Sequence, residues 1–155
     1  MWKTFRKRRI SPQNLLDHYG IRYPPIDVEA IANAMGLRII KTPEPGWSGA
    51  LDLRYDPPVI WLDEKENVLR NRFTIAHELG HLIKHSIPGV KEVFRDSNFR
   101  KDFQDSQANK WAANLLMPPG VVLAVQRKKS IAELVDIFQV SKAAMGYMLM
   151  KLGLC

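Results

Sequence analysis

The spacing of apolar residues along the chain predicts a mixture of helices and short strands. Ser11 and Asp27 are typical N-cap residues of two short helices, which Gly20 and Gly36 would end. Three short runs rich in apolar and β-branched residues come next, at 37–41, 49–55 and 59–62. Together they predict an α+β fold in which a small, mostly antiparallel sheet of about three strands packs on helices.

The middle of the chain predicts two longer helices. A charged segment begins the first of them at Asp63, and apolar residues dominate it from Phe73 onward. The second is expected over 104–117, where the apolar residues recur with helical spacing. The segment between them, 91–103, is charged and has little periodicity, so we interpret it as a loop near the mouth of a cleft.

Residues 120–155 form a C-terminal tail that is helical by its pattern. Ser130 and Glu133 make a capping box, and Ser141 follows a tight turn into a last helix. Two helices joined in this way have the outline of a helix-turn-helix. The last helix offers few base-reading side chains, so its methionines are expected to pack in the core and DNA reading is the weaker interpretation.

Charge and composition narrow the class of protein. The formal net charge of +7 favours an acidic partner or nucleic acid. Residues 1–10 form a basic leader, interpreted as a solvated, mobile terminus. The one cysteine, Cys155, excludes a disulfide within the chain and fits a reducing cytosol. No apolar run is long enough to span a bilayer, so one cytoplasmic domain, 1–155, is expected.

The stretch 74–83 carries the pattern H-E-x-x-H inside an apolar, helix-length run. Residues four apart share one face of a helix, so His77 and His81 can hold one metal ion, and two imidazoles favour zinc. Glu78 is rotated by about 100° from His77 around the helix axis, which suits a general base. Metal-assisted amide hydrolysis is the natural reaction. The alternative is an ordinary amphipathic helix that carries these residues by chance.

A zinc site needs a third protein ligand. His85 continues the row of histidines but lies about 12 Å from His77 along a straight helix, so it is expected to be an end-of-helix residue and not a ligand. Asp105 lies three residues before Ala108, on the apolar stripe of the 104–117 helix, and is our candidate ligand. Its other interpretation is a cap or first-turn residue. Asn109, one turn later, is a candidate to orient a histidine.

Two motifs resemble the ImmA/IrrE family of zinc metallopeptidases. They are R-F-T-I-A-H-E-L-G-H at 72–81 and D-S-Q-A-N-K-W-A-A-N-L-L-M-P at 105–118, and similarity extends over most of the chain. The resemblance implies a zincin-like fold that binds Zn²⁺, with Mn²⁺ as an alternative ion, and it places the third ligand on Asp105. The family carries a glutamate there, so the aspartate shortens the reach by about 1.5 Å, one carbon–carbon bond.

The resemblance also implies a substrate and its mode of binding. Zinc peptidases of this type bind substrate along an edge strand above the metal helix, and 48–53 is the candidate segment. Relatives cleave helix-turn-helix repressors, which implies a protein substrate of that kind. Tyr55, His85 and Tyr147 are candidates for a second electrophile, and the sequence does not choose among them.

Two other functions stay open. In a DNA-binding or protein-interaction regulator the metal would be structural or absent, and the basic charge and the helical tail favour this reading. A toxin of a toxin–antitoxin pair is the other. Neither the pattern nor the composition indicates an oligomeric state.

Overall fold

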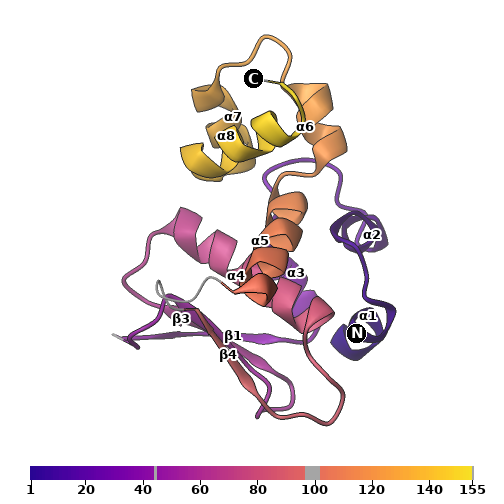
Figure 1. The fold of residues 1–155 in the computed structure, drawn as a ribbon, viewed down its shortest axis with the longest axis vertical. Coiled ribbons are helices and arrows are strands. Elements are labelled where there is room, and N and C mark those ends of the chain that lie inside the picture. The colour runs from indigo at the N-terminus through magenta and orange to yellow at the C-terminus, as the bar shows by residue number, and fades with distance from the viewer. Residues whose placement is uncertain (44, 97–101, 155) are drawn as a thin grey trace.

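The computed structural model describes residues 1–43, 45–96 and 102–154 and has an α+β fold. A sheet lies at one end, the long helices α4 and α5 lie above it, and three helices of the tail form the other end (Figure 1). The expected fold class is therefore confirmed. The helices are α1 (Trp2–Arg8), α2 (Pro12–His18), α3 (Val28–Ala34), α4 (Val68–Lys84), α5 (Phe103–Leu116), α6 (Pro119–Val125), α7 (Ile131–Phe138) and α8 (Lys142–Lys151). The strands are β1 (Arg38–Thr42), β2 (Gly49–Asp52), β3 (Val59–Asp63) and β4 (Val93–Asp96).

The sheet is mixed, with the order β1-β3-β2-β4. β1 runs parallel to β3, whereas β2 is antiparallel to both β3 and β4. Two expectations were wrong. Part of the 91–103 segment is the strand β4, and the rest of that expected loop includes 97–101, outside the described residues. The segment 48–53 is not an edge, because β2 pairs on both sides. Among the described residues the edge strands are β1 and β4.

One face of the sheet packs on α4. Leu51, Ile60 and Leu62 are buried on that face, because side chains alternate between the two sides of a strand. The helix comes very close at Gly49: a Cβ built there would lie 2.1 Å from Cγ2 of Thr74. Only glycine therefore leaves room for α4 against β2.

The other face of the sheet carries a hydrogen-bonded carboxylate. Asp52 is buried on it, with 1% of the residue exposed. It accepts hydrogen bonds from the backbone N–H, Nε and Nη2 of Arg54 and from Nε1 of Trp61. The side-chain hydrogen bond from Arg54 lowers the pKa of Asp52, outweighing the opposite effect of burial.

Replacing Asp52 by asparagine is expected to make the free energy of unfolding less dependent on pH in the acidic range. Because the pKa of Asp52 is lower in the folded protein than in the unfolded chain, its ionised form stabilises the fold above the ordinary pKa of about 3.9. This contribution is lost as the pH falls through the folded-state pKa. Urea denaturation between pH 7 and pH 3 should show wild type more stable than Asp52→Asn at pH 7 and the difference shrinking on acidification. A constant difference would contradict the assignment.

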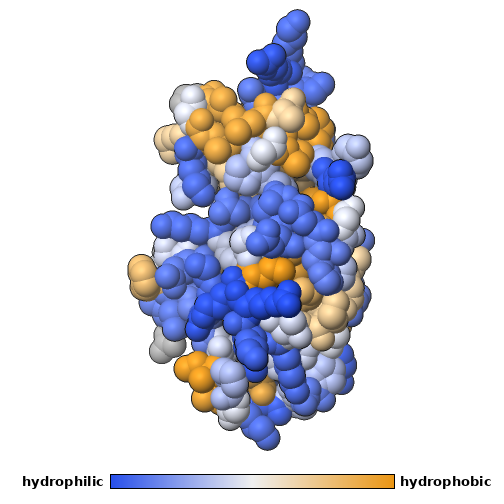
Figure 2. All heavy atoms as spheres, turned by 90° about the vertical axis from the view of Figure 1, so that its right-hand side faces the viewer, coloured by the Kyte–Doolittle hydropathy of each residue, from blue (hydrophilic) through white to orange (hydrophobic). Residues whose placement is uncertain are grey.

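The N-terminal residues form a helix, so the expectation of a mobile basic leader was wrong. Phe5 of α1 is 2% exposed and belongs to the hydrophobic core. The backbone N–H of Trp2 donates to the carbonyl of Met35, and the Arg9 guanidinium donates to the carbonyl of Lys84 at the end of α4. The basic side chains lie on the outer side of α1, and the face that carries α1 and α2 is largely hydrophilic in its middle (Figure 2). Two apolar anchors thus hold a segment whose composition is mostly charged.

Arg72, a partly buried cation of α4, connects this helix to the tail. Arg72 donates hydrogen bonds to the carbonyls of Ile26, Phe138 and Gln139, at 2.7, 3.3 and 3.0 Å. Burial lowers the pKa of its guanidinium. Three carbonyl partners compensate for the lost hydration of the charge, so Arg72 ties the end of α7 to α4.

The tail itself folds as its sequence signals indicate. The capping box of Ser130 and Glu133 starts α7, and Ser141 caps α8. Met145 and Met148 are fully buried, which confirms their expected place in the core. In the part of the chain that the structure describes, no helix has the length and apolar character needed to cross a membrane.

Candidate metal centre

The candidate centre lies where α4 and α5 pack against each other. Gly80 of α4 permits this close packing, because a Cβ at that position would lie 3.0 Å from the carbonyl oxygen and 3.1 Å from Cα of Ala108. Both are backbone atoms of α5 and cannot rotate away. Asp105 lies one turn before Ala108, so the contact at Gly80 sets its distance from the histidines.

Replacing Gly80 by alanine is expected to lower both stability and metal affinity. Helix propensity alone would favour alanine by about 1 kcal/mol, but the added methyl group must push α5 away from α4 at a typical cost of about 1–3 kcal/mol. The displacement would also move Asp105 away from His77 and His81. Chemical denaturation of the metal-free protein and zinc titration of the native protein would measure the two effects.

Gly146→Ala is the matched control. Gly146 lies inside α8, and a Cβ there would meet only Cδ1 of Ile131, at 3.9 Å, an ordinary contact. This variant should be as stable as wild type or slightly more stable, with unchanged zinc affinity. If Gly80→Ala behaved in the same way, the close approach would not determine the geometry of the centre.

Three ligand atoms converge between the two helices. Nε2 of His77 and Nε2 of His81 are 3.1 Å apart. Oδ1 of Asp105 lies 3.0 Å from Nε2 of His81 and 3.5 Å from Nε2 of His77. The histidine side chains are 6% and 3% exposed and that of Asp105 is 16% exposed. The expected triad is therefore assembled, although the shorter aspartate stands where the family motif has a glutamate.

The spacing of these atoms suits a zinc ion. Zinc binds nitrogen and oxygen at about 2.0–2.2 Å in tetrahedral geometry, which places neighbouring ligand atoms about 3.3 Å apart. The three observed separations, 3.0, 3.1 and 3.5 Å, lie close to that value. Two imidazoles and one carboxylate are also the donor set typical of catalytic zinc, which leaves a fourth position for water or substrate. The residues thus fit a metal ion, and His77, His81 and Asp105 would hold it.

The outward nitrogen of each histidine is hydrogen-bonded to the protein. Nδ1 of His77 lies 2.7 Å from Oδ1 of Asn109, which can only accept, so the imidazole carries its proton on Nδ1. Nδ1 of His81 lies 2.9 Å from Nδ1 of His85, whose Nε2 lies 2.8 Å from Oε1 of Gln107. Oε1 of Gln107 accepts the proton of His85 Nε2, so Nδ1 of His85 accepts a hydrogen bond from Nδ1 of His81. Nε2 of His77 and Nε2 of His81 are therefore both unprotonated. Both lone pairs face the metal position.

Hydrophobic rings enclose the centre. Phe73 stacks on His77 with ring centroids 6.4 Å apart, and Phe94 of β4 stacks on His81 at 4.8 Å. Glu78, adjacent to His77 on α4, is completely buried. A carboxylate in such surroundings is costly unless the site uses its charge. The low-polarity enclosure also strengthens electrostatic interactions at the centre.

The remaining candidate residues fall in different places. Tyr55 contacts Trp61 and Arg38, whose side chains lie on the face of the sheet away from α4. His85 ends α4, as expected, but its ring contacts His81 and Gln107 on the side away from the ligand nitrogens. Tyr147 of α8 borders a cavity beside Asn109. Of the three proposed electrophiles, Tyr147 is the one that lines this cavity together with Asn109.

The sequence patterns gave no signal for Phe94 and Gln107. Phe94 belongs to a strand that lies in a charged segment without clear alternation. Gln107 is two residues from Asp105, so it does not lie on the apolar stripe of α5 that identified Asp105 as a candidate. Only the pairing of β4 with β2 and the packing of α5 on α4 bring these two side chains to the histidines.

A histidine pair on one helix, with a carboxylate from a second helix and a glutamate beside the first histidine, is typical of zincin-type metallopeptidases. Residues 32–150 match the model of the peptidase family described as the IrrE N-terminal-like domain. The match covers most of the chain, including α4 and α5, and the chain belongs to this family of metallopeptidases. The resemblance inferred from the two motifs is thus confirmed. No curated protein sequence matches the chain.

Proposed function

We propose that the protein is a zinc-dependent endopeptidase that cleaves a protein substrate in the cytoplasm. The observation that carries this proposal is the convergence of Nε2 of His77, Nε2 of His81 and Oδ1 of Asp105 within 3.0–3.5 Å of one another. A zinc ion bound there supplies Lewis acidity, which activates water and polarises the carbonyl group of the scissile bond.

The chain's own residues supply the proton transfers and the orientation. Glu78 accepts the proton of the attacking water and returns it to the nitrogen of the leaving amine. Asn109 holds His77 in the tautomer that leaves Nε2 free, and His85 with Gln107 does the same for His81. Tyr147 is our candidate to donate a hydrogen bond to the developing oxyanion.

The substrate backbone pairs with β4. Among the described residues, β4 has a neighbouring strand on one side only, and its Phe94 stacks on His81. An extended peptide added along the free edge of β4 would therefore run beside the metal position. This strand takes the role that we first expected for 48–53.

Metal removal tests the proposal. A chelator should stop cleavage of a protein substrate, and one equivalent of zinc should restore it. Manganese is the alternative ion, whereas magnesium should not restore activity because it prefers octahedral oxygen ligands. Cleavage that continued unchanged without metal would overturn the proposal.

The proposed substrate is a helix-turn-helix repressor, and its support is the family to which the chain belongs. Mass spectrometry of a repressor encoded beside this protein, incubated with the zinc-loaded enzyme, should show two fragments from a single cleavage. An intact repressor alongside cleavage of another protein would reject this substrate and keep the peptidase.

A further inference from the structure

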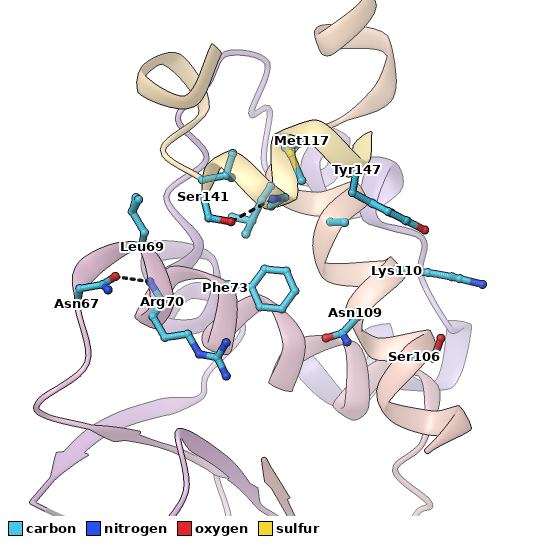
Figure 3. Close-up of a pocket in the computed structure, with 14 residues that line it drawn as sticks. Asn67, Leu69, Arg70, Phe73, Ser106, Asn109, Lys110, Met117, Ser141 and Tyr147 are labelled. Atoms are coloured by element: carbon cyan, nitrogen blue, oxygen red, sulfur yellow. Dashed lines mark hydrogen bonds between the residues drawn. The ribbon is translucent and has the colours of Figure 1, made fainter. Parts of the chain in front are cut away.

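A cavity of about 570 Å³ lies between the first half of α4, α5 and the start of α8. This volume is within the range of about 300–1,000 Å³ typical of ligand sites. Its walls are mainly apolar and include Phe73, Ala113, Leu116 and Ala144. Figure 3 shows Phe73 in the middle of the cavity, with the helices around it.

The cavity is next to the candidate metal centre. Asn109 lines it and is also the residue bonded to Nδ1 of His77. Phe73 lines it and stacks on the ring of the same histidine. One layer of side chains therefore separates the cavity from the metal position. A substrate residue near a bond placed at the metal is within reach of the cavity.

Two cations stand at the mouth of the cavity. Arg70 and Lys110 are both exposed, and Figure 3 shows them on opposite sides of Phe73. Nη2 of Arg70 donates to Oγ of Ser48 at 3.1 Å, which holds the guanidinium in place. Among the residues that the structure describes, none that lines the cavity carries a carboxylate. The mouth is therefore positive, and acidic groups complement it.

The tail provides one wall of the cavity. Val140, Ser141, Ala144 and Tyr147 all line it, and all belong to α8 or the turn before it. This face of α8 is thus directed toward α5 and the cavity. In a helix-turn-helix the equivalent helix would present its residues to a DNA groove. The tail therefore forms one wall of the cavity beside the candidate centre.

We propose that this cavity is the specificity pocket of the peptidase. It takes a large apolar side chain close to the cleaved bond, and Arg70 and Lys110 favour acidic residues beside that side chain. The apolar walls set the first preference, and the unbalanced positive charge at the mouth sets the second. This assignment rests on the proposed function.

Binding by an inactive variant tests the pocket separately from catalysis. Two fluorescent octapeptides would carry a central leucine flanked by glutamates in one and by lysines in the other. Fluorescence anisotropy with zinc-loaded Glu78→Gln should show about tenfold tighter binding of the glutamate peptide, since each exposed ion pair contributes a few-fold. Adding Arg70→Glu and Lys110→Glu should reverse the preference. Lys142→Glu, on α8 and not among the residues that line the cavity, should leave the preference unchanged.

Filling the cavity tests the apolar preference. Ala144→Phe, in the same inactive background, should weaken binding of both peptides at least tenfold. Ala143→Phe is the matched control, because Ala143 is exposed on α8 and does not line the cavity. Circular dichroism would show that both variants remain folded.

The outcomes separate the two proposals. Equal affinity for the two peptides, no binding of either, or a preference that survives the double charge reversal would overturn the pocket. Wild-type enzyme that cleaves both peptides equally would reject the pocket and keep the peptidase. A charge preference in binding, without cleavage of any peptide or protein by the wild type, would keep the pocket and reject the peptidase.

Discussion

Replacing Glu78 by glutamine is expected to lower turnover by a factor of about 10²–10⁴ while zinc content stays at the wild-type level. The amide has nearly the same shape as the carboxylate, so packing around this completely buried side chain is kept. An amide cannot accept the proton of the attacking water, and the reaction loses its general base. Initial rates of substrate cleavage and elemental analysis of the same preparation would measure both quantities.

Glu64→Gln is the control for the loss of a carboxylate. Glu64 is exposed and lies in the turn after β3, outside the candidate centre. The turnover and the zinc content of the Glu64→Gln variant should equal those of wild type. Full turnover in Glu78→Gln would reject Glu78 as the base, whereas loss of zinc from that variant would place Glu78 among the groups that hold the metal.

Replacing Asp105 by alanine is expected to lower zinc affinity at least about a hundredfold, more than the loss of a residue that only orients a ligand. Two histidines remain, but two ligands leave a catalytic zinc site incomplete. Oδ1 of Asp105 lies 3.0 and 3.5 Å from the two ligand nitrogens, so the short side chain already reaches the metal position. Competition titration with a zinc-binding dye would give the affinity.

Asp102→Ala is the control on the same turn. Asp102 caps α5, and its carboxylate accepts a hydrogen bond from the backbone N–H of Asp105. Losing the cap should cost about 1 kcal/mol of stability with little change in zinc affinity. If Asp105→Ala bound zinc as tightly as wild type, Asp105 would be a first-turn residue favoured by the helix dipole, the alternative considered from the sequence.

Local signals in the sequence predicted most elements of this fold. Ser11, Asp27, Ser130 and Ser141 each accept a hydrogen bond from a backbone N–H two or three residues into a helix, as their positions indicated. Such caps depend on a few neighbouring residues, so the sequence contains all the information they need. The helix α1 was missed because its contacts, the burial of Phe5 and the hydrogen bonds of Trp2 and Arg9, are all made with distant parts of the chain.

Elements that depend on distant partners were predicted less well. β4 has four residues and exists because it pairs with β2, more than forty positions earlier in the chain. Without that partner, a charged segment without regular alternation resembles a loop. The place of 48–53 inside the sheet follows from the same pairing, since a strand is an edge or an interior strand only in relation to its neighbours.

The sequence by itself determined the helix that carries His77, Glu78 and His81, because the spacing of four residues is a local property of the α-helix. It also directed Asp105 toward the core through the apolar stripe of its helix. Tertiary structure alone decided how closely α5 approaches α4 at Gly80, which of the two histidines Asn109 orients, and that His85 orients the other. It also decided that the tail closes a positively charged pocket beside them. These contacts join residues far apart in the chain, and their distances depend on how whole helices pack.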